Sequence, residues 1–372
     1  MEIQIARFRE VLELLKPAVA RKPTIKSLAY IMLKDGQAIA TDLETIIATA
    51  VPEADLTTLV PFKDVTKVLQ YVHGGELLHI EAKPGKLSLS WSDGKAAFPV
   101  EEPEDFPDFP EFVPDVEGPL DVDSLIPALA AVLPYAANDA SRPVLNGVTL
   151  ILGDPVEVAA GDGFRMADKV LPLAFPKNII VILPASSVRV LKHLWQKTPR
   201  TPAPSEALIP ILMDKKLAQI AHDGKEGLRF QFGKNTTAIV KLVSGKPPDW
   251  LKLLPKDDPI LKVQVMAPEL ELAVRRVREV AVEEKGIVRM VFKGDTATIS
   301  AKADGQEVQS LVKVLGGSKA KQKFALNESY LLGYLKDKQG IVSITWTGKT
   351  SPVTFQSQND PRVVIMPMMA QW

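Results

Sequence analysis

Apolar residues along this chain recur with two spacings, and the two spacings alternate in a fixed order. Over Ile5–Ala20 and Leu125–Ala137 they recur every three or four residues, which is typical of one face of a helix. Each run is followed by short stretches rich in β-branched residues. In the second case these are Val148–Leu152 and Val156–Ala160, separated by Gly153-Asp154-Pro155. The pattern predicts a helix followed by a β-hairpin in both places.

The same order, helix, strands, helix, strands, occurs three times. In the first copy the predicted helices are Ile5–Ala20, which Pro17 should kink or end, and one that begins at Phe62. The predicted strands of this copy are Ser27–Leu33, Gln37–Thr41, Thr45–Val51, Leu59–Pro61, Leu77–Ala82, Lys86–Trp91 and Ala96–Val100. The second copy adds Val181–Pro184 and a helix that carries Val188, Leu191 and Leu194. The predicted elements of the third copy are helices Glu269–Val282 and Glu328–Lys336 and strands Val288–Phe292, Thr296–Lys302, Val342–Trp346 and Val353–Gln356. The chain then closes with Arg362–Trp372, of which Val364–Met368 is either part of a binding surface or a final buried strand.

Two proline-containing connectors separate the copies. The first, residues 101–119, is acidic, and the second is Ser244–Trp250, whose Pro-Asp pair echoes Phe106-Pro107-Asp108 of the first. Asp42 and Asp162 also occupy the same place after their hairpins. We therefore predict an α+β chain of three repeated domains, residues 1–117, 118–256 and 257–372, each with two helices packed on antiparallel sheets.

Composition sets the broad class of protein. Of the 372 residues 46% are hydrophobic and 24% charged, which is ordinary for a globular chain, and no run is long enough for a membrane span. The first residues lack the layout of a signal peptide. The chain has no cysteine, which excludes disulfides, thiolate metal sites and a cysteine nucleophile. The sequence predicts a cytoplasmic protein with no membrane partner.

The charges are balanced in number but segregated along the chain. Lys+Arg and Asp+Glu both total 45. Basic residues concentrate on one predicted helix of each copy, whereas acidic residues gather in the first connector. A chain of no net charge needs such segregation to bind nucleic acid. The alternative is that these residues form ordinary solvated helix faces.

Residues that would carry catalysis or bind a cofactor do not form a recognisable pattern. The four histidines have no metal-ligand spacing, and Gly161-Asp162-Gly163 lacks the rest of a calcium loop. No phosphate-binding glycine loop or catalytic triad is recognisable. We expect no cofactor, no metal and no catalytic residue, and the repeats favour a binding scaffold. An enzyme whose catalytic residues are dispersed stays open as an alternative.

Several motifs, in order along the whole chain, resemble those of the bacterial DNA polymerase III β subunits, the replication sliding clamps. The matching segments are Thr41–Glu44, Phe106–Asp108, Arg142–Gly147, Gly161–Ala167, Pro248–Trp250 with Leu254-Pro255, and Val363–Met368. The resemblance covers essentially all residues and implies the DNA-clamp fold.

The resemblance implies a non-catalytic processivity factor. Two copies would join head to tail, the third domain of one meeting the first domain of the other, in a ring with helices lining a hole for duplex DNA. Binding to DNA would be independent of sequence. The implied protein partners are the DNA polymerase III α subunit, the clamp loader and other proteins with a clamp-binding peptide motif.

The resemblance also implies two sets of site residues. Lys22 and Arg142 are implied DNA contacts, and the charge pattern adds further DNA-facing candidates on the helices, namely Arg7, Lys192, Lys197, Arg275, Arg276 and Arg278. A peptide-binding groove between the second and third domains is implied at Leu145, Gly161, Gly163, Phe164, Arg165, Met166, Pro248, Lys252, Leu253, Val364, Ile365, Met366, Pro367 and Met368. Flexible methionines suit a surface that accommodates different partners. We expect Arg165 to hold a carbonyl or glutamine side chain of the peptide.

The chain departs from the family pattern at the groove. Phe164 stands where the family often has histidine and Lys252 where it often has arginine, and the chain continues as Met369–Trp372. Trp372 is expected to fold over the groove, and the basic tract Ser318–Lys323 is either a loop or an extra contact. A clamp-like paralogue that serves other partners therefore stays open beside the replicative clamp.

Overall fold

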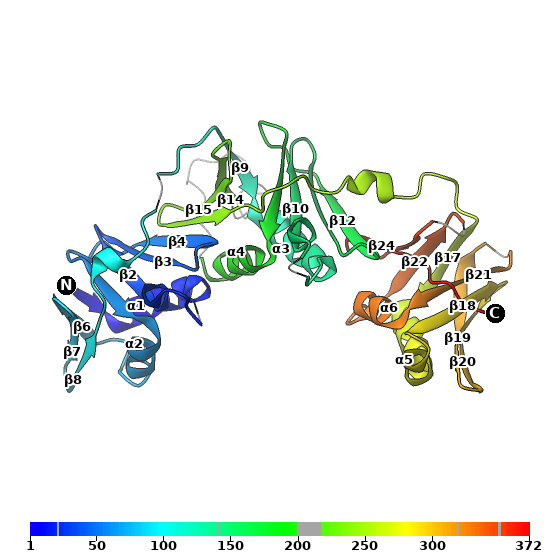
Figure 1. Ribbon diagram of the computed structural model, residues 1–372, viewed down its shortest axis with the longest axis horizontal. Coiled ribbons are helices and arrows are strands. Elements are labelled where there is room, and N and C mark those ends of the chain that lie inside the picture. The colour runs from blue at the N-terminus through cyan, green and yellow to red at the C-terminus, as the bar shows by residue number, and fades with distance from the viewer. Residues whose placement is uncertain (21, 110, 140, 199–216, 319, 349–350) are drawn as a thin grey trace, which may run out of the picture. The chain divides into compact units, whose positions relative to one another are not determined.

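The computed structural model describes residues 1–372 except 21, 110, 140, 199–216, 319 and 349–350. The chain divides into two compact units (Figure 1). Unit 1 comprises residues 1–130, 150–156 and 171–245, and unit 2 comprises residues 131–149, 157–170 and 246–372. Four of the five unit boundaries fall within α3 (Val122–Val132), β10 (Gly147–Leu152), β11 (Val156–Gly161) and β12 (Arg165–Leu171), and the fifth falls within the second connector.

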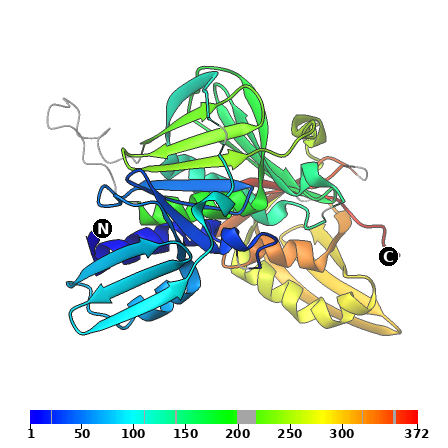
Figure 2. The same ribbon diagram turned by 60° about the vertical axis from the view of Figure 1, so that its left-hand side comes forward.

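Unit 1 contains an eight-stranded and a four-stranded sheet. The strand orders are β5-β2-β3-β4-β16-β15-β14-β9 and β1-β6-β7-β8; Figure 2 shows the smaller sheet in blue to cyan. The strands are β1 (Glu2–Gln4), β2 (Tyr30–Lys34), β3 (Gln37–Thr41), β4 (Thr45–Ala50), β5 (Thr58–Pro61), β6 (Leu77–Lys83), β7 (Lys86–Trp91), β8 (Gly94–Pro99), β9 (Val116–Asp121), β14 (Leu217–His222), β15 (Gly227–Phe232) and β16 (Thr236–Lys241). Strand β13 (Ile179–Pro184) also belongs to this unit.

The helices of unit 1 are amphipathic, as their apolar spacing predicts. They are α1 (Ile5–Leu15), α2 (Phe62–Leu69), α4 (Ala185–Lys197) and most of α3. Helix α1 buries Ile5, Phe8 and Leu15 among others on one face. It ends earlier than Ala20, because Pro17 has no amide hydrogen to continue it and the chain passes into a 3-10 turn over Lys16–Ala18.

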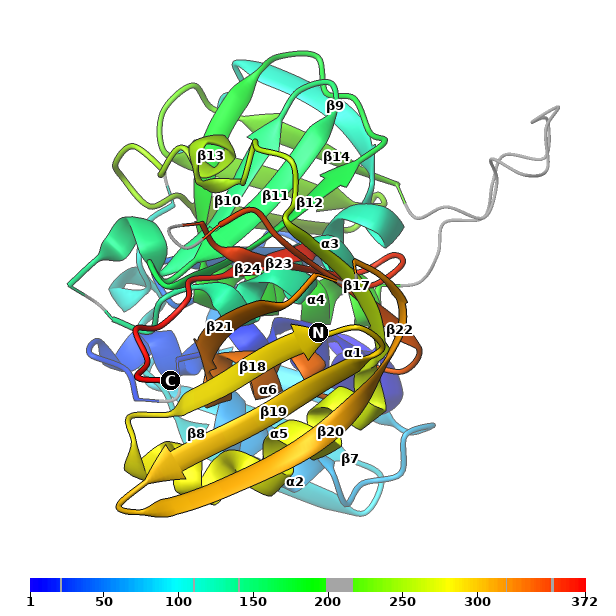
Figure 3. The same ribbon diagram turned by 90° about the vertical axis from the view of Figure 1, so that its right-hand side faces the viewer.

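Unit 2 contains a long twisted sheet covered by two helices. The strand order is β11-β12-β24-β23-β22-β17-β20-β19-β18-β21. Its further strands are β17 (Leu261–Met266), β18 (Ile287–Lys293), β19 (Thr296–Ala303), β20 (Gln306–Gly317), β21 (Gln322–Asn327), β22 (Ile341–Trp346), β23 (Val353–Gln356) and β24 (Arg362–Ile365). Figure 3 shows β18, β19 and β20 in yellow to orange, with α5 (Ala267–Glu283) and α6 (Glu328–Leu335) behind them.

The element order confirms the predicted threefold repetition. Each repeat runs strand, helix, four strands, helix, three strands: β1 to β8 with α1 and α2, β9 to β16 with α3 and α4, and β17 to β24 with α5 and α6. Residues 118–256, the predicted second domain, contribute to both compact units. The three domain boundaries themselves therefore stay a prediction.

Consecutive repeats meet through antiparallel edge strands. Strand β4 pairs with β16, with Ile46 opposite Ile239. Strand β12 pairs with β24, with Met166 opposite Val364. By the order of elements, β20 corresponds to β4 and β12, and β8 corresponds to β16 and β24. In the described chain β8 pairs only with β7, and residues 306–313 of β20 pair only with β19. Each of these strands therefore has an edge open to a further strand.

Candidate functional site

A groove of about 370 Å³ lies beside the β12–β24 junction, entirely within unit 2. We call it the β12–β24 groove. It is formed by the turn before β12, the segment that follows the second connector, the loop before β23, and β24. Its lining residues are Gly163, Phe164, Arg165, Met166, Trp250, Lys252, Leu253, Leu254, Pro255, Lys256, Asp257, Ser351, Pro352, Val364 and Met366.

The turn before β12 is built around Asp162. One carboxylate oxygen, Oδ1, accepts hydrogen bonds from the backbone amides of Phe164 at 2.9 Å and Arg165 at 3.0 Å. Such a bond pattern is an Asx turn, which an aspartate after a strand favours. Gly163 adopts φ +97°, a conformation that a side chain would strain. The turn leaves the Phe164 ring 59% exposed at the groove.

The floor of the groove is a small apolar cluster. Trp250, Met166 and Val364 are buried together with Ala159, and Leu145 and Leu254 pack against them. Gly161 makes this packing possible, because a Cβ at that position would lie 2.8 Å from the Trp250 ring. The connector is thereby held against the sheet, which leaves a preformed apolar surface.

Arg165 is engaged by groups of its own unit. Its Nε donates to Asp162 Oδ2 at 3.0 Å and its Nη2 to the carbonyl oxygen of Pro134 at 3.0 Å. The guanidinium lies over the rings of Tyr330, at 4.7 Å, and Tyr135, at 5.2 Å. Burial raises the pKa of Tyr135 to about 12 although the arginine opposes that shift. These contacts make Arg165 a wall of the groove. The sequence led us to expect that its guanidinium holds a carbonyl or glutamine side chain of the bound peptide.

The rim of the groove carries positive charge. Lys252 Nζ lies 2.9 Å from Asp249 Oδ2, and this hydrogen bond raises the pKa of the lysine and lowers the pKa of the aspartate. Both side chains are solvent-exposed, so the pair contributes little to stability. Lys256 also lines the groove, and Asp257 is the one carboxylate among the lining residues of the described chain.

The last residues leave the groove and follow β21. The amide of Met366 donates to the carbonyl oxygen of Phe164 at 2.8 Å, and that of Met368 to the carbonyl oxygen of Ala325 at 2.8 Å. The Trp372 ring lies 4.5 Å from Lys323 Nζ and is not among the residues that line the groove. Lys323 belongs to the basic tract whose role the sequence left open, and Gln322 and Lys323 in fact begin β21.

Eight of the fourteen predicted groove residues line the groove: Gly163, Phe164, Arg165, Met166, Lys252, Leu253, Val364 and Met366. Leu145 and Gly161 support the floor, and the carbonyl oxygen of Pro248 accepts the Trp250 amide at 3.0 Å. Ile365 is fully buried, and Pro367 and Met368 lie beyond the groove along the chain. Trp250, Leu254 and Pro255 were missed as lining residues although their motif was recognised. Lys256, Asp257, Ser351 and Pro352 carry no sequence signal that would have found them.

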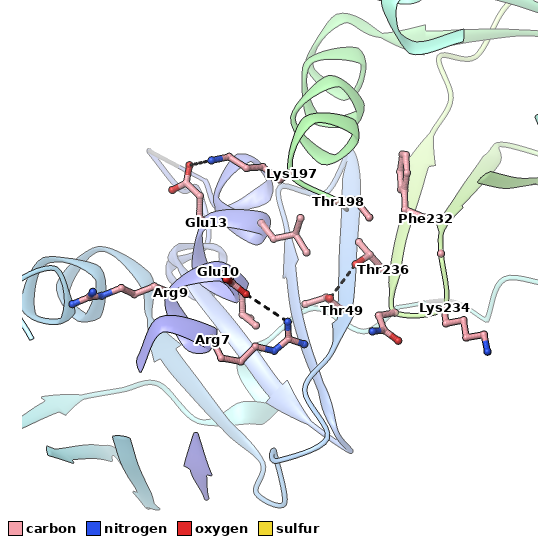
Figure 4. Close-up of a pocket in the computed structure, with 14 residues that line it drawn as sticks. Arg7, Arg9, Glu10, Glu13, Thr49, Lys197, Thr198, Phe232, Lys234 and Thr236 are labelled. Carbon is pink, nitrogen blue, oxygen red and sulfur yellow. Dashed lines mark hydrogen bonds and ion pairs between the residues drawn. The ribbon is translucent and has the colours of Figure 1, made fainter. Parts of the chain in front are cut away.

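The predicted DNA-facing cations lie on α1, α4 and α5 or in exposed loops. Arg7 and Lys197 line a hollow of about 700 Å³ in unit 1, where they pair with Glu10 at 3.8 Å and Glu13 at 3.9 Å (Figure 4). Ion pairs also engage Arg142 with Asp139, Arg275 with Glu271, and Arg278 with Glu279 and Glu328. Arg276 donates to Ser310 Oγ at 3.3 Å, and Lys22 and Lys192 are exposed and make no ion pair with described residues. The positive charge of these helices is therefore partly neutralised.

Two features of the described residues bear on metal binding and membrane insertion. They contain no group of three or more histidine, aspartate or glutamate side chains placed to hold a metal ion. None of their helices is both long and apolar enough to cross a membrane.

Comparison with solved structures identifies the fold. A DNA polymerase sliding clamp from Pseudomonas aeruginosa with ligand superposes with a TM-score of 0.86 at 22% identity, covering 100% of this chain and 99% of that one. The DNA polymerase III β subunit of Thermotoga maritima gives 0.84 at 19% identity, with the same coverage. The polymerase β subunit of Streptococcus pyogenes gives 0.85 at 16% identity, covering 99% of both chains. No protein-family model and no curated protein sequence matches the chain. The predicted sliding-clamp fold is confirmed over the full length.

Proposed function

We propose that this chain is a sliding clamp of DNA replication related to the bacterial DNA polymerase III β subunits. It acts in the cytoplasm as a non-catalytic processivity factor, a homodimeric ring that encircles duplex DNA and tethers the polymerase. The observation that carries the proposal is the match to sliding clamps along the whole chain, together with two open strand edges at the ends of the repeat series.

Ring closure follows from the internal repeats. Two junctions inside the chain, β4 with β16 and β12 with β24, join successive repeats by the same antiparallel pairing. The third junction of the series would pair β20 with β8, and a head-to-tail contact between two copies supplies it twice. Leu311, near the middle of β20, is 66% exposed, which is unusual for a leucine in a strand and fits a surface that a partner covers.

DNA is held by charge alone. Long basic side chains attract phosphates without contacting base edges, so the contact has no sequence preference and lets the ring slide. Lys22, Lys192 and Arg276 are exposed and make no ion pair with described residues, although Arg276 donates to Ser310 Oγ, so all three are available for phosphates. The other five cations must exchange a carboxylate for a phosphate, which keeps the attraction weak. Enclosure then supplies the persistence that the contacts lack.

The β12–β24 groove is the tether for protein partners. Its floor of Trp250, Met166 and Val364 suits apolar side chains of a short peptide, and Met366, 42% exposed, has the flexibility to adapt to different sequences. The partners are the DNA polymerase III α subunit, the clamp loader and other proteins with a clamp-binding motif. Each would present the motif in a flexible segment.

Sedimentation equilibrium of the full chain tests the proposal. We expect twice the chain mass of 40.6 kDa, and Leu311→Glu should shift the population toward the single-chain mass. Leu217→Glu is the matched control, because Leu217 is 54% exposed in β14, which pairs on both sides with β15 and β9. A chain that stays monomeric at micromolar concentration, or that dissociates equally in both variants, would contradict ring closure through β20.

A further inference from the structure

A second groove lies beside the β4–β16 junction, within unit 1, and has a volume of about 470 Å³. We call it the β4–β16 groove. Thr41–Ile46 and the first connector form one side of it, and β16 with the turn before β15 forms the other. Nothing in the proposed function uses this groove.

The turn at this groove repeats the geometry of the turn before β12. Asp42 Oδ1 accepts the backbone amides of Glu44 at 3.1 Å and Thr45 at 2.7 Å, as Asp162 does in the other repeat. Asp42 also donates its amide to the carbonyl oxygen of Thr45, and Asp162 donates its amide to that of Arg165. The two turns are therefore equivalent residue by residue, with Glu44 in the place of Phe164.

The floor and the connector correspond as well. Ile46 faces Ile239 across β4 and β16, where Met166 faces Val364 in the other groove, and all four residues line their grooves. The sequence Pro107-Asp108-Phe109 matches Pro248-Asp249-Trp250. Three residues further on, Phe112 matches Leu253, and both line their grooves.

The connector is fixed in place, so the β4–β16 groove is preformed. The Phe109 ring packs edge-on against buried Phe106 at 5.7 Å. Arg229 lies 5.0 Å over the Phe112 ring and pairs with Glu117 at 3.2 Å. A preformed apolar surface loses little entropy when a ligand binds.

Leu43 provides an independent sign that this groove is used. It has φ +73°, in the left-handed region that a branched apolar residue rarely adopts, and it corresponds to Gly163 of the other turn. The Leu43 side chain is 49% exposed at the groove. Glycine would fit this backbone without strain, so the leucine is not explained by the turn itself.

The two grooves differ in charge. The lining of the β4–β16 groove carries five carboxylates, Glu44, Asp108, Glu111, Asp223 and Glu226, against two lysines. None of the five makes an ion pair with a described residue. At the matching connector position the β12–β24 groove has Lys252 where this groove has Glu111. Phosphates would be repelled here, which excludes DNA as the ligand.

We infer that the β4–β16 groove is a second peptide-binding site, and that it takes a short extended segment with two apolar side chains flanked by lysine or arginine. The apolar anchors pack on Ile46, Ile239 and Phe109, and the basic residues face Glu44 and Glu111. The inference goes beyond the proposed function and holds whether or not the chain forms a ring. It gives one chain two sites with opposite charge preference.

Fluorescence anisotropy of the full chain tests this with three labelled hexapeptides. All share a leucine-phenylalanine pair, which is flanked by two arginines, two glutamines or two glutamates. We expect the arginine peptide to bind more tightly than the glutamine peptide, with a Kd that rises with salt. Glu111→Lys should weaken it about fivefold and improve binding of the glutamate peptide. Leu43→Gly should weaken both the arginine and the glutamine peptide and should not lower the melting temperature.

Met366→Asp in the other groove is the matched control and should leave the arginine peptide unaffected. Equal binding of the arginine and glutamine peptides, or a Kd of the arginine peptide that is unchanged in Glu111→Lys, would overturn the inference. Loss of binding in Met366→Asp alone would also overturn it, because the peptide would then sit in the β12–β24 groove. The anisotropy results do not depend on the oligomeric state. Failure of the second peptide site is therefore distinguishable from failure of the proposed clamp, which sedimentation tests.

Discussion

A single methyl group added at Gly161 tests how the floor of the β12–β24 groove is built. Its Cβ would lie 2.8 Å from Cζ3 of Trp250 and 2.9 Å from the carbonyl oxygen of Arg165. Because atoms in a packed interior do not approach so closely, the indole must move away from Met166 and Val364. Forcing an extra methyl group into a well-packed site costs about 1–3 kcal/mol. We expect Gly161→Ala to lower the free energy of unfolding of unit 2 by about that amount and to weaken peptide binding.

The first repeat shows what should restore the packing. Thr41 occupies the place of Gly161, and Phe109 occupies the place of Trp250, so a side chain is tolerated there beside a smaller ring. Trp250→Phe should therefore partly rescue Gly161→Ala, because it relieves the contact with the ring but not the one with the Arg165 carbonyl oxygen; the coupling energy should be about 1 kcal/mol in a double-mutant cycle. The measurement is amide hydrogen exchange of β12 and β24 under native conditions, which reports on unit 2 separately.

Gly163→Ala is the control for this cycle. It introduces strain at φ +97° but no clash, since the nearest atom to its Cβ is an Arg142 nitrogen at 3.4 Å. The free energy of unfolding lost through Gly163→Ala should therefore be the same with tryptophan or phenylalanine at position 250. If the effects of Gly161→Ala and Trp250→Phe on stability are additive, or if Trp250→Phe rescues Gly163→Ala equally well, then the indole does not require a glycine at position 161.

Three further predictions follow from individual contacts. Met366→Asp should abolish peptide binding to the β12–β24 groove, measured by anisotropy, whereas Met368→Asp should leave it nearly unchanged, because Met366 lines the groove and Met368 does not. Burial raises the pKa of the Asp42 carboxyl group in the folded state above its usual 3.8. The resulting contribution to stability is therefore present in full below the usual pKa and is lost as the pH rises through the raised pKa. Asp42→Asn keeps the acceptor of the Asx turn, so its melting temperature should exceed that of the native chain near pH 7, and the gain should vanish toward about pH 4; a gain that is independent of pH would point to another cause. Lys192→Gln and Arg276→Gln should each reduce the slope of log K against log salt for DNA binding by about 0.9, and an unchanged slope would remove that residue from the phosphate contacts.

Much of the fold could be predicted because its elements carry strong periodicity. Helix α2 begins at Phe62, and β7 spans Lys86–Trp91, both as expected. The turn between β2 and β3 follows from Asp35 and Gly36, which adopt φ +49° and +70°. The long strand β20 was missed although Val308, Val312 and Val314 lie within it, since no turn residue marks where it crosses from β19 to β17.

The site was less predictable because its parts are far apart in the sequence. Motif order found the turn before β12 and the strand β24, but not Ser351 and Pro352, which reach the groove only through the pairing of β23 with β24. Charge counting found basic helices, yet Lys197 pairs with Glu13, a residue of a different helix. Sequence patterns predict which face of an element is polar, whereas the partner of each charge depends on tertiary packing.

Retention on circular DNA shows most directly whether the protein encloses the duplex. The chain is loaded on nicked circular duplex by a cognate clamp loader, and the circle is then cut once with a restriction enzyme. We expect the protein to stay bound to the intact circle and to be lost from the linear product, because enclosure and not contact holds it. Protein that is retained equally on both forms, or that is never loaded, would show that it does not act as a ring around DNA.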